Sequence, residues 1–292
     1  MSETEKNVPL FLTTKEVADL LRVKERKVYD LAAADEIPHR RITGKLLFPA
    51  QALQSWIDGD EGSGAQDRPN VLAGSHDPLL DWAIRASGCG LATLCNGSRD
   101  GLDQFTSGSA LAAGLHLPDE DGWNVAAVSA SGNTDCVLIG WAVRKRGLLV
   151  STEVEKAVQS MSDLKGRRVA QRQAGAGAAL LFEKLLKDAG LSESDLILCK
   201  DRAHTESDAA AAVASGEADA ALGIEAMARR FKLSFLPLAD ENYDLLIDRK
   251  SYFTAPVQKL LAFARTRDFL EKAEALGGYD LTDLGSVRWL SD

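Results

Sequence analysis

Residues 12–57 read LTTKEVADLLRVKERKVYDLAAADEIPHRRITGKLLFPAQALQSWI, and this stretch decides the fold of the first part of the chain. Thr13 can cap a first helix, and Glu16, three residues later, can complete a capping box around it. Apolar residues recur at helical spacing on both sides of the short segment 22–24. The stretch therefore predicts two helices that are joined by a tight turn.

A hairpin pattern follows the second helix. Residues 39–42 and 45–48 are predicted to form two short strands that turn at residues 43–44, and a closing helix runs to Ile57. The predicted order is helix, turn, helix, β-wing, helix. Two helices joined in this way can hold the second one in the major groove of DNA, while the first braces it across the backbone.

Basic side chains gather where such a module would touch DNA. Residues 10–57 hold eight Lys and Arg against six Asp and Glu, and the positive charges cluster on the second helix and the wing. We therefore predict that DNA is a partner of the chain. The predicted contact residues are Lys24, Arg26, Lys27 and Tyr29 of the second helix and Arg40, Arg41 and Lys45 of the wing.

This stretch resembles the excisionase-like, MerR-related family of winged helix-turn-helix domains. The family pattern is close to LTTxEVAxLLxVxxxTVYxLxxxGxIPxxRxGxxxxxPxxxLxxWI, and the resemblance covers nearly the whole stretch. Lys24 stands where the family often has a small capping Ser, and Lys27 where it often has Thr, so the base preference does not carry over. The alternative is a winged helix that makes protein contacts instead.

The composition of the 292 residues is that of a globular protein, with 45% apolar and 26% charged residues. The net charge is −9, and the part outside residues 10–57 carries about −11 (26 basic against 37 acidic residues), which would confine DNA binding to the N-terminal domain. The first residues, MSETEKNVPLF, hold charges where a signal peptide needs an apolar core, and no apolar run is long enough to span a membrane. We expect a cytoplasmic protein.

The four cysteines form no C-x-x-C pair, and no His stands at zinc-finger spacing from them. We interpret them as small buried residues, and we predict no metal and no cofactor. The sequence also lacks a G-x-S-x-G motif and a P-loop, so nothing in it specifies catalysis.

Residues 58–70, DGDEGSGAQDRPN, contain Gly, Ser, Asp and Pro and one Ala as the only apolar residue, so they are predicted to be a linker. The linker separates a DNA-binding domain at residues 10–57 from a second domain at residues 71–292. The second domain repeats a strand, a small polar turn and a helix four times. Such repeats predict an α/β fold with parallel strands covered by helices. Two similar small-residue segments, 106–114 and 214–223, indicate two lobes of like build.

The second domain is similar to the cytoplasmic relatives of type II periplasmic binding proteins, and in particular to their molybdate- and tungstate-binding branch. The resemblance implies a bilobal domain with two mixed, mainly parallel sheets. It places residues 71 to about 145 and about 240–292 in one lobe, with the other lobe between them. The segments that carry it are AGSHDPLL (73–80), NGSRDGL (96–102), GLHL (114–117), RGLLV (146–150), RQAGAG (172–177), GIEAMAR (223–229), YDLLI (243–247) and GGYDL (277–281).

A ligand of such a domain would lie beyond the carboxyl ends of the strands, against the starts of helices. Hydroxyls, basic groups and free helix-start amides would donate hydrogen bonds to a small oxyanion there. Glycines would let the backbone approach the ligand closely. The candidate ligand-binding residues are Ser75, His76, Ser98, His116, Arg172, Gln173, Gly175, Gly177, Thr205, Glu225 and Tyr243.

Each candidate has a structural alternative. Ser75 could only cap a helix, Arg172 could pair with a surface carboxylate, and either histidine could be a hydrogen-bonded structural residue. Glu225 and Tyr243 could belong to the hinge or the wall. Residues 175–179, GAGAA, also lack the hydroxyl and basic side chains that relatives carry, which points to a different or partly organic ligand.

The sequence thus predicts a one-component transcription regulator, which would act as a homodimer because paired heads read two half-sites. Its ligand would be molybdate, tungstate or another small anion. The alternatives are a scaffold protein that binds no ligand and an enzyme built on the bilobal fold, although we predict no enzymatic activity.

Overall fold

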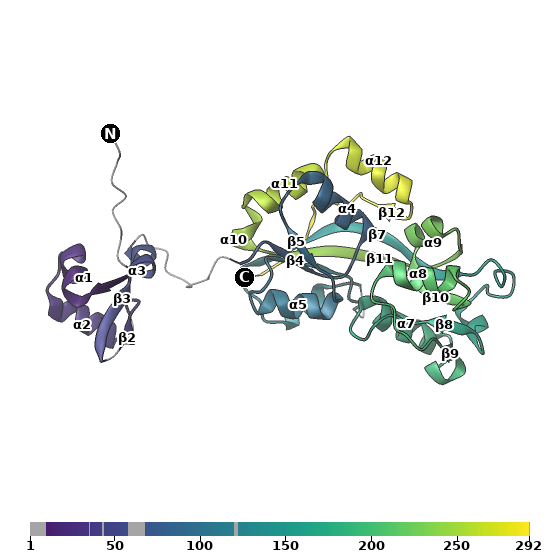
Figure 1. Ribbon diagram of the computed structural model, residues 1–292, viewed down its shortest axis with the longest axis horizontal. Coiled ribbons are helices and arrows are strands. Elements are labelled where there is room, and N and C mark those ends of the chain that lie inside the picture. Colours follow the sequence, from purple (N-terminus) through teal and green to yellow (C-terminus); the bar gives the residue numbers. More distant parts are fainter. Residues whose placement is uncertain (1–9, 35, 43, 58–67, 120–121, 292) are drawn as a thin grey trace. The chain divides into compact units, whose positions relative to one another are not determined.

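The computed structural model describes residues 10–34, 36–42, 44–57, 68–119 and 122–291. The chain divides into two compact units, residues 1–66 and 67–292 (Figure 1). Thr43 of the predicted wing turn and residues 58–67 of the predicted linker lie outside the described residues.

The N-terminal unit has the predicted order of helices and wing, with one strand added before the first helix. Thr13 and Glu16 form the expected capping box, in which the backbone N–H of Thr13 donates to the Glu16 carboxylate at 2.7 Å. The added strand pairs with the wing, so the sheet order is β1-β3-β2. The elements are β1 (Phe11–Thr13), α1 (Thr14–Leu21), α2 (Glu25–Ala33), β2 (Arg40–Ile42), β3 (Lys45–Pro49) and α3 (Ala50–Ile57).

The core of this unit is formed by apolar residues from each helix and from the wing. Val17 of α1, Val28 of α2, Phe48 of β3 and Leu53 of α3 are all fully buried. Because these residues come from all three helices and from strand β3, the hydrophobic pattern accounts for how α2 is held on the rest of the unit.

The second unit alternates strands and helices, as the repeats predict, and its two lobes are named here by their elements. Lobe one contains β4 (Val71–Gly74), α4 (Pro78–Ser87), β5 (Ala92–Leu94), α5 (Ser98–Thr106), β6 (Ala112–Leu115), α6 (Val125–Ala130), α10 (Arg249–Tyr252), α11 (Ala255–Phe263), α12 (Arg267–Leu276), β12 (Tyr279–Asp280) and β13 (Val287–Leu290). Lobe two contains the short 3-10 helices Met161–Leu164 and Glu193–Asp195, β8 (Arg168–Ala170), α7 (Gly177–Asp188), β9 (Ile197–Leu198), α8 (Glu206–Ala214), β10 (Ala220–Ile224) and α9 (Glu225–Phe231).

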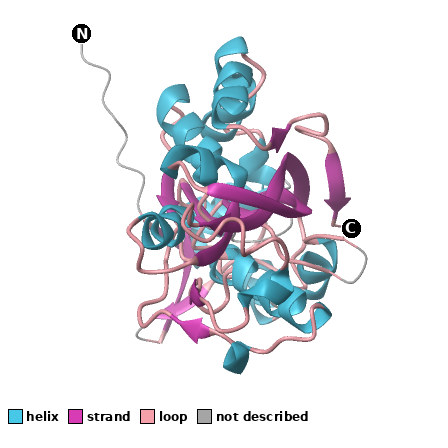
Figure 2. Ribbon diagram, turned by 90° about the vertical axis from the view of Figure 1, so that its right-hand side faces the viewer, coloured by secondary structure: helices cyan, strands magenta, loops and turns pink. Residues whose placement is uncertain are grey.

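Two long antiparallel strands, β7 (Cys136–Val150) and β11 (Ser234–Asp248), run through both lobes. They join the lobes into one ten-stranded curled sheet of order β5-β4-β6-β11-β7-β10-β8-β9, with β12 and β13 also paired to β7. The two sheets that the sequence predicts are therefore two halves of one sheet, because each crossing strand continues from one half into the other. Within each half the outer strands are parallel, and helices lie on both faces (Figures 1 and 2).

Each lobe has its own apolar core. In lobe one, α4, α11 and α12 pack over one face of the sheet around the fully buried Trp141 and Phe269 (Figure 1). In lobe two, α7 packs Leu181 and Phe182 against Leu148 and Leu222. Among the helices of the described residues, none is both long and apolar enough to cross a membrane.

A buried carboxylate lies where the C-terminal strand joins lobe one. Asp244 of β11 is 1% exposed, and it accepts a hydrogen bond of 2.7 Å from the side-chain amide of Asn124. The Nε atom of Arg288, on β13, is 3.7 Å from the other oxygen of Asp244. Burial raises the pKa of Asp244 to about 6, although Asn124 and Arg288 both favour the ionised form.

We expect Asp244 to make the stability of the folded chain depend on pH. Because its pKa is higher in the folded state than its ordinary value of 3.8, the folded state gains stability below pH ~4 and loses it as the pH rises through about 6. The full loss is on the order of 3 kcal/mol. The free energies of unfolding of the wild type and of Asp244→Asn can be measured with urea. Relative to the wild type, the variant should become more stable as the pH rises from ~4 to ~8.

The control is Asp283→Asn, which removes the half-exposed carboxylate that pairs with the same arginine at 3.0 Å. Because the negative charge of Asp283 makes only the smallest contribution to the raised pKa of Asp244, this variant should keep most of the pH dependence of the wild type. If the difference in free energy of unfolding between the wild type and Asp244→Asn does not change with pH, Asp244 is not the source of the pH dependence.

Candidate functional site

The N-terminal unit presents the predicted DNA-binding residues to solvent. All seven are exposed, from Lys24 at the start of α2 to Lys45 in the wing. Tyr29, Arg41 and Lys45 line one hollow of about 390 Å³, which they share with Lys15 at the start of α1. No Asp or Glu is among the described residues that line this hollow, so its charge is positive. Sequence reasoning left Lys15 out, because its place beside the wing depends on the pairing of β1 with β3.

In the second unit, three of the predicted ligand-binding residues come together beyond the carboxyl ends of β4, β5 and β6, and a fourth, Tyr243, contacts them from within β11. Ser75 follows β4, Ser98 begins α5 and His116 follows β6. The hydroxyls of Ser75 and Ser98 are 2.8 Å apart, and the backbone N–H of His116 donates to the Ser98 hydroxyl at 3.1 Å. The phenol of Tyr243, from β11, donates to the backbone carbonyl of Ser75. All four residues are buried.

The glycine-rich segment of lobe two packs directly on this cluster. The side chain of Gln173 donates to the backbone carbonyl of Asn96 at 2.6 Å. A Cβ atom added at Gly177 would lie 2.2 Å from the carbonyl oxygen of His116. The small residues of the segment 175–179 therefore allow the two lobes to pack closely against each other. That contact gives a physical reason for the missing hydroxyl and basic side chains.

Arg172 extends from lobe two into a network of charged side chains that sequence reasoning missed. Its Nη1 atom donates to Glu206, the first residue of α8, at 2.8 Å. Arg146 of β7 donates from Nη1 to both oxygens of the same carboxylate, at 2.9 and 3.0 Å. Arg172 is therefore paired with a buried carboxylate, whereas the sequence alternative was a surface one.

The network continues through the crossing strands to lobe one. Glu241 of β11 accepts hydrogen bonds from Arg146 and from Arg144, which stand two residues apart on β7. Arg144 also donates to Asp77, the N-cap of α4, at 3.0 Å, and the phenol of Tyr279 donates to Asp77 at 2.8 Å. The charged groups of this network are three arginines and three carboxylates, so they balance.

The electrostatic environment keeps these groups ionised despite their burial. Burial by itself would raise the pKa of Glu206, but Arg146 and Arg172 lower it to about 2. Burial would likewise lower the pKa of Arg144, and Glu241 and Asp77 raise it instead. His116, whose Nδ1 atom is 2.9 Å from Glu241, is the exception, because burial outweighs the carboxylate and lowers its pKa. His116 is therefore neutral near pH 7.

The remaining predicted residues have other surroundings. His76 is half-buried, and its Nδ1 atom is buried without a hydrogen-bond partner among the described residues. Thr205 caps α8, accepting from the backbone N–H of Asp208 at 3.0 Å. Gly175 has a positive φ of 81° and lines a pocket of about 80 Å³ together with Arg172.

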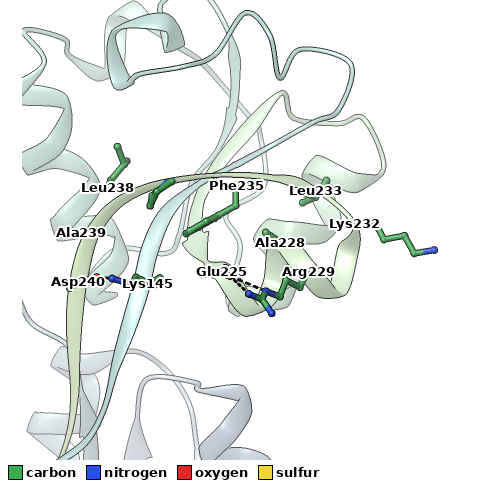
Figure 3. Close-up of a pocket in the computed structure, with 11 residues that line it drawn as sticks. Lys145, Glu225, Ala228, Arg229, Lys232, Leu233, Phe235, Leu238, Ala239 and Asp240 are labelled. Atoms are coloured by element: carbon green, nitrogen blue, oxygen red, sulfur yellow. Dashed lines mark hydrogen bonds and ion pairs between the residues drawn. The ribbon is translucent and has the colours of Figure 1, made fainter. Parts of the chain in front are cut away.

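Glu225 begins α9 and pairs with Arg229 at 2.6 Å in a different hollow, of about 770 Å³ (Figure 3). Lys145 lines the same hollow and pairs with Asp240. Side chains alternate between the two faces of a strand, so Lys145 lies on the face opposite to its neighbours Arg144 and Arg146. Glu225 therefore stands apart from the charged network.

The geometry is suited to holding a small polar or anionic molecule. Hydroxyls of lobe one and arginine side chains are connected between the lobes through His116 and Glu241, and a pocket of about 80 Å³ in lobe two, beside Arg172, has room for a few atoms. In the part of the chain that the structure describes, no group of three His, Cys, Asp or Glu side chains is placed to bind a metal ion.

The one sequence signal for the network is the triplet Arg144-Lys145-Arg146 inside a long apolar strand. Two charges spaced i, i+2 on a strand share one face. When the flanking residues are apolar on both faces, that face is buried and its charges must be paired. Their partners, Glu206 and Glu241, stand 60 and 95 residues further on, so no local pattern identifies them.

Comparisons with known families match the two units of the chain with two different families. Residues 11–60 match the family described as "Helix-turn-helix domain", and residues 82–265 match the "PBP superfamily domain". The chain is 28% identical over 301 residues to the uncharacterized protein YvgK of Bacillus subtilis (strain 168), with 94% of this chain and 96% of that protein covered.

Two solved structures share the fold of the second unit. PhnD1 from Prochlorococcus marinus (MIT 9301), in complex with methylphosphonate, has a TM-score of 0.53 at 13% identity, and 74% of this chain and 92% of that chain are covered. A putative phosphate ABC transporter substrate-binding protein from Clostridium perfringens, with bound phosphate, has a TM-score of 0.53 at 10% identity, with 70% and 96% covered.

We expect the buried network to dominate the stability of the second unit. Arg144→Met leaves part of the Glu241 and Asp77 charge uncompensated in a dry interior, which costs about 3–5 kcal/mol. Lys145→Met, one residue away, removes only the half-exposed pair with Asp240 and should change stability far less, because water screens that pair. Urea unfolding of both variants measures the difference. Similar unfolding midpoints for the two variants would contradict this role of Arg144.

Proposed function

Because the chain belongs to the PBP superfamily, we propose that its second domain, residues 71–292, senses a small ligand between its lobes and controls the DNA-binding domain at residues 10–57. The protein would then be a one-component transcription regulator that acts in the cytoplasm. The observation that carries this proposal is a cluster of hydroxyls and arginines between two lobes, in the same chain as a helix-turn-helix domain with a basic hollow.

DNA recognition is assigned to the exposed face of α2 and to the wing. Arg26 and Lys27 are exposed in the first turn of α2, where side chains reach base edges and phosphates in domains of this build. Arg41 and Lys45 lie in the wing beside Tyr29, where they can contact the phosphate backbone. The pattern of residues 12–57 supports membership of the excisionase-like, MerR-related group.

The ligand that we propose is a small anion such as molybdate or tungstate. Ser75 and Ser98 can donate hydroxyl hydrogen bonds, and Arg172 can supply positive charge beside the glycine-rich segment. Binding would favour one arrangement of the two lobes. In a homodimer, this change would alter the spacing of the two DNA-binding heads, which is how ligand and DNA affinity would be coupled.

DNA binding can be tested on the region upstream of the gene that encodes the chain. Fluorescence anisotropy should detect salt-sensitive, sequence-selective binding by two chains per site. Arg41→Ala and Lys45→Ala should each weaken binding roughly tenfold and make the salt dependence less steep by about one phosphate contact. Arg267→Ala, at an exposed position of α12, is the control and should leave binding unchanged. A lack of selective binding under every ligand condition would refute the regulator proposal.

Ligand binding can be tested by thermal melting with molybdate, tungstate, sulfate and phosphate, each added separately. At a concentration of about 100 times Kd, a true ligand stabilises the folded chain by about 2.7 kcal/mol. Arg172→Met should abolish that stabilisation, and Arg230→Met, at an exposed position of the same lobe, should keep it. Absence of stabilisation by all four anions, with DNA binding intact, would favour a scaffold protein that binds no ligand.

A further inference from the structure

Glu206 already occupies the place that an anion would take between two arginines. The residue is 1% exposed, and its carboxylate receives three hydrogen bonds, two from Arg146 and one from Arg172, at 2.8 to 3.0 Å. The two arginines come from different elements, the crossing strand β7 and the segment after β8. Bonds between guanidinium and carboxylate groups are among the stronger hydrogen bonds in proteins.

Glu206 is also the group that has to leave if an anion binds to Arg172. The other donors of Arg172 are occupied by uncharged groups, since Nε donates to the backbone carbonyl of Ala203 and Nη2 to that of His204. Glu206 is thus the one ionised partner of Arg172 among the described residues. An anion bound to this guanidinium with Glu206 still in place would add negative charge beside a network whose charges already balance.

We propose that Glu206 is an internal competitor for anions, which an incoming small anion displaces from Arg146 and Arg172, and that this exchange sets the anion affinity of the site. The inference rests on the proposed ligand site between the lobes and adds the residue that regulates it. An anion would approach through the pocket of about 80 Å³, which Arg172 lines together with Gly175 and Arg202, and it would have to pass the carboxylates of Glu183 and Glu193, which line the same pocket. Glu206 is not among the residues that line that pocket.

Protonation does not release Glu206 under ordinary conditions. Burial favours its neutral form, but Arg146 and Arg172 lower its pKa to about 2, so it stays ionised at neutral pH. The exchange therefore replaces one anion by another. A monovalent anion keeps the balance of charge in the network, and a dianion such as sulfate or molybdate adds one negative charge to it. The position of this exchange equilibrium depends on the anion concentration and on how well the anion matches two guanidinium groups.

The test uses the full chain in chloride buffer, with sodium sulfate and sodium molybdate as separate probes. Glu206→Gln keeps the shape of the side chain and removes its charge, so two buried arginines lose their partner. The variant should melt below the wild type without added anion, and each anion should raise its melting temperature. By calorimetric titration, the Kd for sulfate or molybdate should fall at least tenfold relative to the wild type.

The matched control is Glu217→Gln, which makes the same change of charge at an exposed position of lobe two and should leave anion affinity unchanged. The double variant Glu206→Gln/Arg172→Met should lose the increase in anion affinity, which would show that the anion binds at Arg172. If Glu206→Gln does not fold even with anion present, Glu206→Asp decides. Its shorter side chain reaches the arginines less well, so a rise in anion affinity supports the proposal and no rise overturns it.

The outcomes separate this inference from the proposed function. If wild type and Glu206→Gln bind molybdate equally tightly, the internal competitor is wrong and anion sensing stands. If Glu206→Gln binds anions and the wild type binds none, the competitor is supported and anion sensing by the natural chain fails. If Glu206→Gln gains no more affinity than Glu217→Gln, the inference is overturned whatever the wild type binds.

Discussion

The second unit depends on the pairing of Glu241 with Arg144 and Arg146 inside the two crossing strands. Charges without solvent are costly unless they are paired and fully hydrogen-bonded. One carboxylate cannot satisfy two guanidinium groups, and the strands supply no second one to these arginines. The missing carboxylates come from the helix starts of the two lobes, Asp77 of α4 in lobe one and Glu206 of α8 in lobe two. The charges on the crossing strands are thus satisfied only when both lobes pack against them.

Small residues make this arrangement sterically possible. Gly74, Gly101 and Gly114 bring β4, α5 and β6 within backbone contact, and a Cβ atom at Gly114 would overlap the phenol of Tyr243. Gly177 does the same between the lobes, where its Cα faces the carbonyl of His116. Close approach removes water from the space between the lobes, which strengthens the interactions of the charged network. The glycines that we first interpreted as room for a ligand therefore also hold the lobes together.

How much the sequence could predict depends on how local the interactions are. The capping box of Thr13 and Glu16 joins residues three apart, so the head could be derived almost completely, except for β1, whose three residues are too few to show a pattern. The convergence of Ser75, Ser98 and His116 could be predicted because each follows the end of a strand, and parallel strand ends converge. Arg146, Glu206 and Glu241 were missed because their charged partners are 34 to 97 residues away. For Thr205 the sequence leaves two roles open, since a local cap at a helix start looks the same in sequence as a ligand donor.

The balance of charge between the lobes limits how a bound anion could act. A ligand shifts a conformational equilibrium only by the difference in its affinity for the two states. A monovalent anion that replaces the Glu206 carboxylate leaves the charge on Arg146 and Arg172 neutralised as before, whereas a dianion such as molybdate adds one negative charge to the network. With either anion, a further difference comes from the displaced side chain, which stands in the first turn of α8. The next residue, Ser207, contacts Met227 of α9, and Ala210 of α8 packs in the same apolar cluster. If Glu206 is displaced, α8 and α9 are therefore the elements whose packing would carry the change out of the site.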